Sequence, residues 1–231
     1  MIHLFFMATH NIIFTAGGSG KRMNTDIPKQ FIPVSEKPML MWAMEAFELF
    51  DTSIKRIIVL PAERISLWKE LCEEFNFNID HQIVEGGPTR FESVRNGVLH
   101  ADDGGLTGIH DGVRPFPSID TIRNAFETAE KYGTAIPYIN STDTLRQTSG
   151  EDSHPIDRSK IKRIQTPQVF RTEIIKKAYQ QDYQEFFTDD ASVVEAMGHQ
   201  IHLCKGNEEN LKVTTRMDLR IAIMLGNLMK K

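Results

Sequence analysis

The residues from Asn11 to Gln30 constrain the fold and the function of this 231-residue chain more than any other stretch. A short apolar run, Ile12 to Phe14, is typical of a buried strand and leads into the turn Ala16 to Gly20, AGGSG. Glycines leave the backbone N–H groups of such a turn free to approach an anion. Arg22 and Lys29 then supply cations. This order of strand, glycine turn and cations predicts a polyphosphate site.

Two common phosphate-binding motifs do not match this turn. A P-loop has Gly-x-x-x-x-Gly-Lys and then Ser or Thr, but here Thr15 stands at the first glycine and Arg22 at the hydroxyl position. The dinucleotide fingerprint needs a third glycine, and that position is Met23. What remains, Gly-Gly-Ser-Gly-Lys-Arg-Met and then Pro-Lys-Gln, resembles the signature of nucleotidyltransferases that join a nucleotide to a sugar phosphate.

Composition excludes several classes of protein. The net charge of −4 argues against nucleic acid as a partner, because duplex-binding proteins show a broad basic face. Cys72 and Cys204 match no metal or redox spacing, which indicates thiols in a reducing compartment. The first ten residues lack the basic start and the cleavage site of a signal peptide, and no run is long enough to span a membrane. We expect a cytoplasmic protein with no membrane partner.

Strand and helix patterns alternate along the first 140 residues. The expected strands are 12–14, 56–60, 79–84, 106–110 and 134–139, and the expected helices are 38–50, 62–75, 89–101 and 118–132. This alternation predicts an α/β fold, with a mostly parallel twisted sheet covered by helices on both faces, in one domain over 1–231. Ligands bind such sheets at the carboxyl ends of the strands, where the first glycine turn, Gly86-Gly87 and Asp111 all fall.

The pattern changes in the second half of the chain. Residues 140–163 are polar, and a connection of that length is usually functional, so we expect a projecting arm, built as a β-hairpin. The alternative is a disordered surface insert. Beyond it, residues 164–170 return to the core, helices are expected at 172–179, 189–197 and 215–229, and strands at 201–204 and 211–213. The last helix is expected to begin after Thr215 and to face inward with Ile221, Met224, Leu225 and Leu228.

Two further stretches carry polar groups to the strand ends. The turn Gly86 to Ser93 runs into a helix that Thr89 and Glu92 begin with a capping box. Its free N–H groups suit a polar ligand edge such as a pyrimidine, although a plain strand-to-helix turn has the same pattern. Asp111 places a carboxylate where nucleotide enzymes bind ribose hydroxyls or Mg²⁺. His110 is expected to be structural, and no side chains have zinc spacing.

These motifs, taken in order, resemble those of the 2-C-methyl-D-erythritol 4-phosphate cytidylyltransferase family of the non-mevalonate isoprenoid pathway. They cover nearly the whole chain after Asn11: Gly18 to Met23, Pro28-Lys29-Gln30, Gly86-Gly87 with Arg90 and Ser93, His110-Asp111 with Arg114-Pro115, Asp143-Thr144, Asp157-Arg158, Thr166-Pro167-Gln168, Thr188 to Ser192, and Asn210 to Thr214. The resemblance implies a cytidylyltransferase that joins CTP to 2-C-methyl-D-erythritol 4-phosphate, a polyol phosphate, and gives CDP-methylerythritol and pyrophosphate.

The resemblance also implies roles for individual residues. The implied catalytic residues are Arg22, Lys29, Arg158 and Lys212. The implied binding residues are Ala16, Gly17, Gly18, Gly20, Gly87, Ser93, Asp111, Arg114, Thr144, Thr166 and Thr188. Asp111 would also bind the divalent cation, Mg²⁺. The arm would cross a homodimer, so that Thr144 and Arg158 complete the partner's sugar-phosphate site.

Some residues depart from the family pattern. Pro88 stands where many members have an acid, Gly112-Val113 replaces a pair of alanines, and Asp190 replaces a glutamate. Related cytidylyltransferases that use ribitol 5-phosphate share most of the motifs, so this substrate stays an alternative. A second alternative is a nucleotide-binding protein without catalysis, which would be expected to have lost one of the four cations.

Overall fold

A mixed, mostly parallel sheet forms the centre of the molecule. The structure is a computed structural model and describes residues 10–18 and 27–229. The strand order of the sheet is β10-β7-β11-β6-β1-β4-β5, with β12 beside β7. The bounds are β1 Asn11–Thr15, β4 Lys55–Leu60, β5 Gln82–Glu85, β6 Leu106–Asp111, β7 Thr134–Asn140, β10 Lys162–Ile164, β11 Gln168–Arg171 and β12 Leu203–Lys205. The expected α/β class is confirmed. Strands β6, β1, β4 and β5 are mutually parallel, whereas β11 runs antiparallel to β6 and β7.

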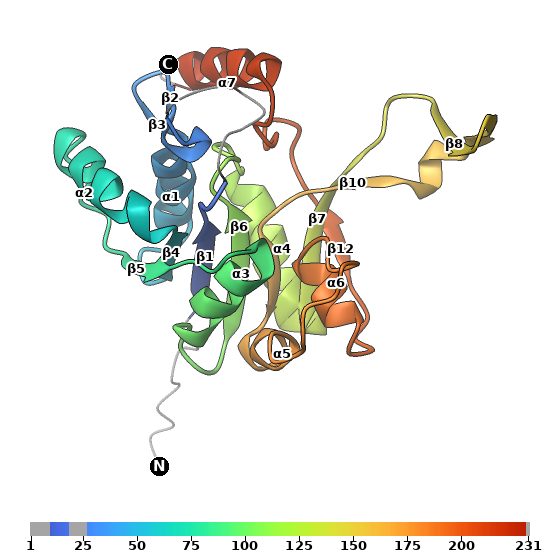
Figure 1. Cartoon of the computed structure of the whole chain (residues 1–231), viewed down its shortest axis with the longest axis horizontal. Coiled ribbons are helices and arrows are strands. Elements are labelled where there is room, and N and C mark those ends of the chain that lie inside the picture. The colour runs from blue at the N-terminus through green and yellow to red at the C-terminus, as the bar shows by residue number, and fades with distance from the viewer. Residues whose placement is uncertain (1–9, 19–26, 230–231) are drawn as a thin grey trace.

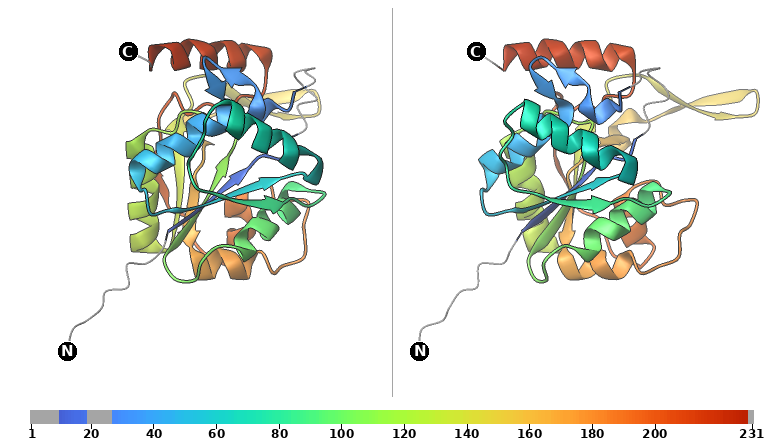
Figure 2. Two further views of the ribbon diagram at one scale, coloured as in Figure 1. Left: turned by 90° about the vertical axis from the view of Figure 1, so that its left-hand side faces the viewer. Right: turned by 60° about the vertical axis from the view of Figure 1, so that its left-hand side comes forward.

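Helices cover both faces of this sheet, as the alternation predicts (Figures 1 and 2). The bounds are α1 Met39–Phe50, α2 Ile65–Glu74, α3 Arg90–Leu99, α4 Ile119–Tyr132, α5 Thr172–Ala178, α6 Asp190–Glu195 and α7 Arg216–Leu228. Successive side chains of β1 point to opposite faces, and each face has its own core. Ile12 and Phe14 pack with α1, α2 and α4, while Ile13 packs with α3, α5 and α6. No helix among the described residues is long and apolar enough to cross a membrane.

Three local expectations are wrong. The helix expected from residue 62 begins at Ile65, because a 3₁₀ turn, Ala62–Arg64, follows Pro61. The strand expected over 79–84 pairs with β4 only from Gln82 onward. Residues 211–213 do not form a strand, since Val213 donates its N–H to the loop carbonyl of Val113. A small hairpin that was not expected, β2 Pro33–Val34 with β3 Lys37–Pro38, precedes α1.

The inward face predicted for α7 is only partly confirmed: Leu225 is partly buried and packs against the cluster that contains Val34 and Phe116. Thr215 caps the helix with Asp218 as expected, but Ile221, Met224 and Leu228 are exposed. The buried positions are Ala222 and Gly226, and a Cβ at Gly226 would lie 3.1 Å from Val34 Cγ1. The helix therefore lies close to the β2–β3 hairpin, and the small residues Ala222 and Gly226 are buried there beside the partly buried Leu219 and Leu225. Apolar periodicity alone does not separate these two faces.

The polar insert contains a two-stranded hairpin. Strand β8, Leu145–Ser149, pairs antiparallel with β9, Asp152–Ile156, and almost all of their side chains are exposed. The hairpin extends away from the central sheet (Figures 1 and 2). A 3₁₀ turn, Arg158–Lys160, leads back to β10.

The contact between α3 and the sheet gives a prediction for stability. A Cβ at Gly97 would lie 2.8 Å from Cγ2 of both Ile13 and Val59. Overpacking destabilises a core by about 1–3 kcal/mol. The higher helix propensity of Ala offsets about 1 kcal/mol of this loss relative to Gly. We expect Gly97→Ala to lower the free energy of unfolding by about 1–2 kcal/mol in urea titrations. Leu99→Ala, at an exposed site of the same helix, is the control, and equal stabilities of the two variants would contradict the packing argument.

Candidate active site

The carboxyl ends of the four parallel strands meet around one cavity of about 310 Å³. We call it the glycine-turn cavity. It is lined by Thr15, Ala16, Gly17, Gly18, Lys29, Gln30, Pro61, Gly87, Pro88, Thr89, Arg90, Ser93, Asp111, Val113, Lys212 and Thr214. Each of the strands β1, β4, β5 and β6 contributes its last residue or the residues that follow it, as ligand sites of parallel sheets do.

The first glycine turn is held at its start by neighbouring strand ends. Ala16 donates its N–H to Val59 O at 3.0 Å, and Gly112 donates to Thr15 O at 3.0 Å. The Nε2 of Gln30 donates to Ala16 O at 2.5 Å. Sequence reasoning did not assign a role to Gln30, although it directly follows Lys29. Its Oε1 is buried and has no hydrogen-bond partner among the described residues, 10–18 and 27–229.

Lys29 is placed in the cavity by a short 3₁₀ turn, Lys29–Phe31, that follows Pro28. The ring of Phe31 is buried and stacks on Trp68, with ring centroids 5.6 Å apart. Lys29 itself is only 7% exposed. Because Phe31 in the same 3₁₀ turn is buried, it holds Lys29 beside the glycine turn. A cation placed before the ligand arrives is what neutralisation of phosphate charge requires.

The second glycine turn is fixed by Ser93 and by the capping box at the start of α3. The Oγ of Ser93 accepts from Gly87 N at 3.1 Å and lies 2.8 Å from Thr89 O. Thr89 and Glu92 form the reciprocal bonds of the capping box, as the sequence predicts. Gly87 and Ser93 therefore present ordered backbone and hydroxyl groups to the cavity.

Asp111 at the end of β6 is the centre of a charged cluster. Its Oδ2 accepts from Lys212 Nζ at 3.0 Å and from Arg114 Nε at 3.2 Å. Burial alone would raise the pKa of the Asp111 carboxyl, but the charges of Lys212, Arg90 and Arg114 outweigh burial and hold this pKa well below its usual value. The carboxylate is thus ionised throughout the neutral range and orients the lysine.

A smaller cavity, of about 180 Å³, adjoins the first and is called here the Thr166 cavity. It is lined by Arg90, Asp111, Arg114, Ile164, Gln165, Thr166, Gln168, Thr188, Asp189 and Lys212. Arg90, Asp111 and Lys212 line both cavities. Two ligands bound side by side would therefore meet at these three charged groups.

Arg90 is a site residue to which the sequence motifs assign no individual role. Its guanidinium donates to both carboxylate oxygens of Asp190, at 2.9 and 2.7 Å, and Tyr179 Oη donates to the same carboxylate at 2.5 Å. Asp190 is fully buried in α6. A bidentate pair of this kind fixes the plane of the guanidinium and joins the first residue of α3 to the first residue of α6. The partners are 100 residues apart, and no local pattern shows the pair.

The predicted residues separate into three groups. Those brought to the two cavities are Ala16, Gly17, Gly18, Lys29, Gly87, Ser93, Asp111, Arg114, Thr166, Thr188 and Lys212. Gly20 and Arg22 lie outside the described residues. Thr144 and Arg158 lie on the arm and line neither cavity, and Arg158 donates to Thr142 O at 2.6 Å.

The residues of the cavity fit a magnesium ion that is held mainly by phosphates. Within the described part of the chain, no three His, Cys, Asp or Glu side chains could bind a metal together. Mg²⁺ commonly uses one carboxylate together with substrate phosphates and water. Asp111 supplies one carboxylate beside the glycine turn, and its Oδ2 is already bonded to two cations. Its other oxygen is the group that would hold such an ion.

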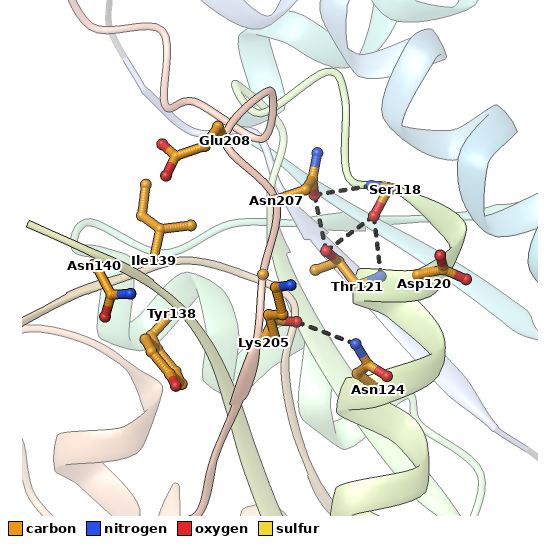
Figure 3. A pocket seen from close by; sticks show the side chains of 11 residues that line it. Ser118, Asp120, Thr121, Asn124, Tyr138, Ile139, Asn140, Lys205, Asn207 and Glu208 are labelled. Atoms are coloured by element: carbon orange, nitrogen blue, oxygen red, sulfur yellow. Dashed lines mark hydrogen bonds between the residues drawn. The ribbon is translucent and has the colours of Figure 1, made fainter.

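Another cavity, of about 620 Å³, lies between the start of α4, β7 and residues 205–208 (Figure 3). It contains none of the predicted site residues. Its polar groups bond to one another, as Figure 3 shows: Thr121 Oγ1 donates to Asn207 Oδ1 at 2.9 Å, and Asn124 donates to Lys205 O at 3.3 Å. We therefore do not assign it to the candidate active site.

A mostly parallel sheet, two glycine turns that follow its strands and a charged cluster at the strand ends define a nucleotide-binding α/β protein. Comparison with known proteins makes the assignment specific. The chain matches the model of the IspD family, 2-C-methyl-D-erythritol 4-phosphate cytidylyltransferase, over residues 10–226. It belongs to this family and is a nucleotidyltransferase, as the motifs predict.

Relatives and solved structures agree with this assignment. A 2-C-methyl-D-erythritol 4-phosphate cytidylyltransferase from Bacteroides thetaiotaomicron is 48% identical over 215 residues, which cover 93% of this chain and 98% of the relative. The crystal structure of the protein of that name from Thermus thermophilus is 26% identical, with a TM-score of 0.75 over 93% of this chain and 98% of that one. The 4-diphosphocytidyl-2C-methyl-D-erythritol synthase structure from Anaerococcus prevotii, 24% identical, has the same fold, with a TM-score of 0.80 over 95% and 99% of the two chains.

His110 behind the site gives a pH prediction. Its ring is fully buried, as expected for a structural histidine, and burial lowers its pKa from 6.5 to about 4. Because the folded state binds this proton less readily than the unfolded chain, the stability it contributes is present above pH 6.5 and is lost as the pH falls toward 4. We expect the free energy of unfolding to fall by roughly 2 kcal/mol from this group between pH 7.5 and 5.

The measurement compares urea unfolding of the wild type and of His110→Gln across that range. Subtracting the free energy of unfolding of the variant from that of the wild type cancels the contribution of the carboxylates, because these groups titrate in both proteins. The difference should shrink as the pH falls, and a difference that is independent of pH would contradict the assignment of a neutral, buried imidazole.

Proposed function

We propose that this protein joins CTP to 2-C-methyl-D-erythritol 4-phosphate and releases pyrophosphate, which gives CDP-methylerythritol. The observation that carries the proposal is the pair of adjoining cavities that share Arg90, Asp111 and Lys212. The larger cavity has two glycine turns that suit a nucleotide, and the smaller one has room for a small polar substrate. The names of the family and of its relatives supply the two substrates.

In this proposal the nucleotide lies in the glycine-turn cavity. Backbone groups of Ala16, Gly17 and Gly18 face its phosphates and its sugar, and Gly87 and Ser93 face the cytosine edge. Asp111 lies toward the ribose and the metal. Gln30 holds Ala16 at the start of the first turn, and Ser93 holds Gly87 in the second, which supports a site that is formed before the ligand binds. An enzyme that uses CTP is expected in the cytoplasm, where the nucleotide is made.

The chemistry needs charge neutralisation more than a general base. A phosphate monoester has a second pKa near ~6, so the attacking phosphate is already largely dianionic at neutral pH. Negative charge then grows on the α-phosphate and on the departing pyrophosphate. Lys29 and Arg22 are proposed to stabilise this charge, and Lys212 and Arg158 to position the attacking phosphate. When bound, Mg²⁺ would add charge neutralisation between the phosphates, with Asp111 as its ligand from the protein.

The arm is proposed to complete the site of a second subunit. Thr144 and Arg158 are exposed and distant from the cavities of their own chain, yet the family motifs include both residues. A projecting hairpin with few buried side chains is stabilised most readily by a second copy, and two-fold dimers are the commonest assemblies. Each subunit would then reach the partner's Thr166 cavity with Arg158.

The experiment that tests the function is pyrophosphate release from each nucleoside triphosphate with each polyol phosphate. We expect turnover with CTP and 2-C-methyl-D-erythritol 4-phosphate, and much lower kcat/KM with ATP, because a missed buried hydrogen bond at the base costs about 1–3 kcal/mol. A greater kcat/KM with ribitol 5-phosphate than with 2-C-methyl-D-erythritol 4-phosphate would show that the proposed acceptor substrate is wrong. No turnover with any pair, although CTP binds, would favour a protein without catalysis.

Lys29 gives the first prediction about catalysis. Lys29→Ala should lower kcat by a hundredfold or more, because loss of one preorganised donor to developing charge costs about 3–4 kcal/mol. Lys69→Ala, at an exposed position of α2, is the matched control. Steady-state kinetics with a check of the unfolding midpoint measures both variants. If Lys29→Ala retained more than a tenth of the wild-type kcat, its role would be wrong.

Subunit mixing tests the arm. Arg158→Ala and Lys29→Ala chains should each be nearly inactive alone. In a mixed dimer, one site combines intact Lys29 of one chain with intact Arg158 of the other, so activity should return toward half of the wild-type value. Affinity tags of two kinds isolate the mixed dimer. An active monomer in sedimentation, or an isolated mixed dimer without activity, would show that the site is not shared.

A further inference from the structure

Two stacked, buried rings join the turn that carries Lys29 to helix α2. Phe31 is 1% exposed and lies against the indole of Trp68, with the two ring planes 18° apart. Phe31 and Lys29 share one 3₁₀ turn, which Ile32 N closes by donating to Lys29 O at 3.0 Å. A shift of the Phe31 ring would therefore shift Lys29 as well.

The indole of Trp68 is oriented by a hydrogen bond to His81, which precedes β5. Trp68 is fully buried, and its Nε1 lies 3.0 Å from His81 Nε2. An indole nitrogen can only donate, so His81 Nε2 is the acceptor. The other ring nitrogen, Nδ1, lies 2.7 Å from the carbonyl oxygen of Ile79, which can only accept. His81 thus connects the indole to the backbone of the loop before β5.

This hydrogen bond supplies a direction that apolar packing does not. Trp68 also packs against the ring of Phe77, with centroids 6.0 Å apart, but the hydrophobic effect is not directional. The bond requires one edge of the indole to face His81, and so it fixes the plane on which Phe31 stacks. A buried N–H without an acceptor is unfavourable, so loss of the bond would favour another orientation of the indole.

We propose that Trp68 and His81 are positioning residues for Lys29. Their hydrogen bond sets the plane of the indole, and the indole places Phe31 and with it Lys29 in the glycine-turn cavity. This inference rests on the proposed function, in which Lys29 stabilises charge during the transfer. Within the described residues, 10–18 and 27–229, the linings of the two cavities do not include Trp68 or His81, so neither would touch a substrate bound there.

The consequence is that a residue outside the site affects the chemical step. A displacement of about 1 Å in a catalytic group can lower the rate on the order of a hundredfold. His81→Leu has no acceptor for the indole. We expect this variant to lower kcat about tenfold and to leave KM for the acceptor substrate within about twofold of the wild type, in steady-state kinetics.

Two matched variants separate the hydrogen bond from general damage to the fold. His81→Gln keeps an acceptor for the indole and should retain most of the wild-type kcat. His100→Leu removes an exposed imidazole at the end of α3 and should leave kcat unchanged. If His81→Gln lost as much activity as His81→Leu, the hydrogen bond would not be the cause and the proposal would be wrong.

A double-mutant cycle with Lys29 is the decisive measurement. If His81 acts through Lys29, His81→Leu should change kcat less than about twofold in the Lys29→Ala background. The same loss of kcat in both backgrounds would overturn the proposal. Should His81→Leu fail to fold, Trp68→Phe takes its place in the cycle, because it keeps a ring beside Phe31 and lacks the N–H group.

Fluorescence reports on the hydrogen bond without any turnover. In a Trp42→Phe background, Trp68 is the remaining tryptophan of the chain. Its emission should move to shorter wavelength in His81→Leu, where the indole loses its acceptor, and should keep its position in His81→Gln. Unchanged emission in His81→Leu would show that the bond does not orient the indole and would contradict the proposal.

The inference and the proposed function fail separately. If the wild type binds CTP but releases no pyrophosphate with any acceptor, the proposed function fails, and the cycle is then measured as CTP affinity by calorimetry. His81→Leu should weaken CTP binding when Lys29 is present and add no further loss to Lys29→Ala. If turnover is as proposed but the two losses of kcat add, only the inference about Trp68 and His81 fails.

Discussion

The ion pair between Asp111 and Lys212 is the interaction on which the site depends. Asp111 ends the strand β6, and Lys212 comes from a loop 101 residues later, in a segment that is bonded through Val213 to Val113. Asp111 is the buried partner, whereas the side chain of Lys212 is 45% exposed; without a cation the buried carboxylate would be an uncompensated charge, which is costly. The pair therefore fixes the later loop against the strand ends and places a cation where two cavities meet.

The sheet makes this arrangement possible. Four parallel strands bring their carboxyl ends together, so a turn that follows each strand faces the same space. The antiparallel strand β11 and the loop before it bring Thr166 and Gln168 to the other side of Asp111. One carboxylate thus lies between a cavity made by glycine turns and a cavity made by later segments. A nucleotidyltransferase needs this geometry, because the attacking phosphate must approach the α-phosphate in line.

The sequence predicts those parts of the fold and the site that local residue patterns encode. The glycine turn after β1, the capping box at Thr89 and the carboxylate at Asp111 are such patterns, and each lies where it was expected. The bidentate pair of Arg90 with Asp190 was missed because its partners meet only through the packing of α3 on α6. The buried face of α7 was predicted only in part for the same reason, since tertiary contact with a small hairpin, and not periodicity, decides which face is buried.

A crystal structure with a non-hydrolysable CTP analogue, Mg²⁺ and 2-C-methyl-D-erythritol 4-phosphate tests the central claim most directly. The account predicts the triphosphate along Ala16 to Gly18 with Lys29 beside it, and the acceptor phosphate within hydrogen-bonding distance of Lys212 Nζ. A nucleotide bound outside the glycine-turn cavity, or an acceptor phosphate distant from Lys212, would contradict it.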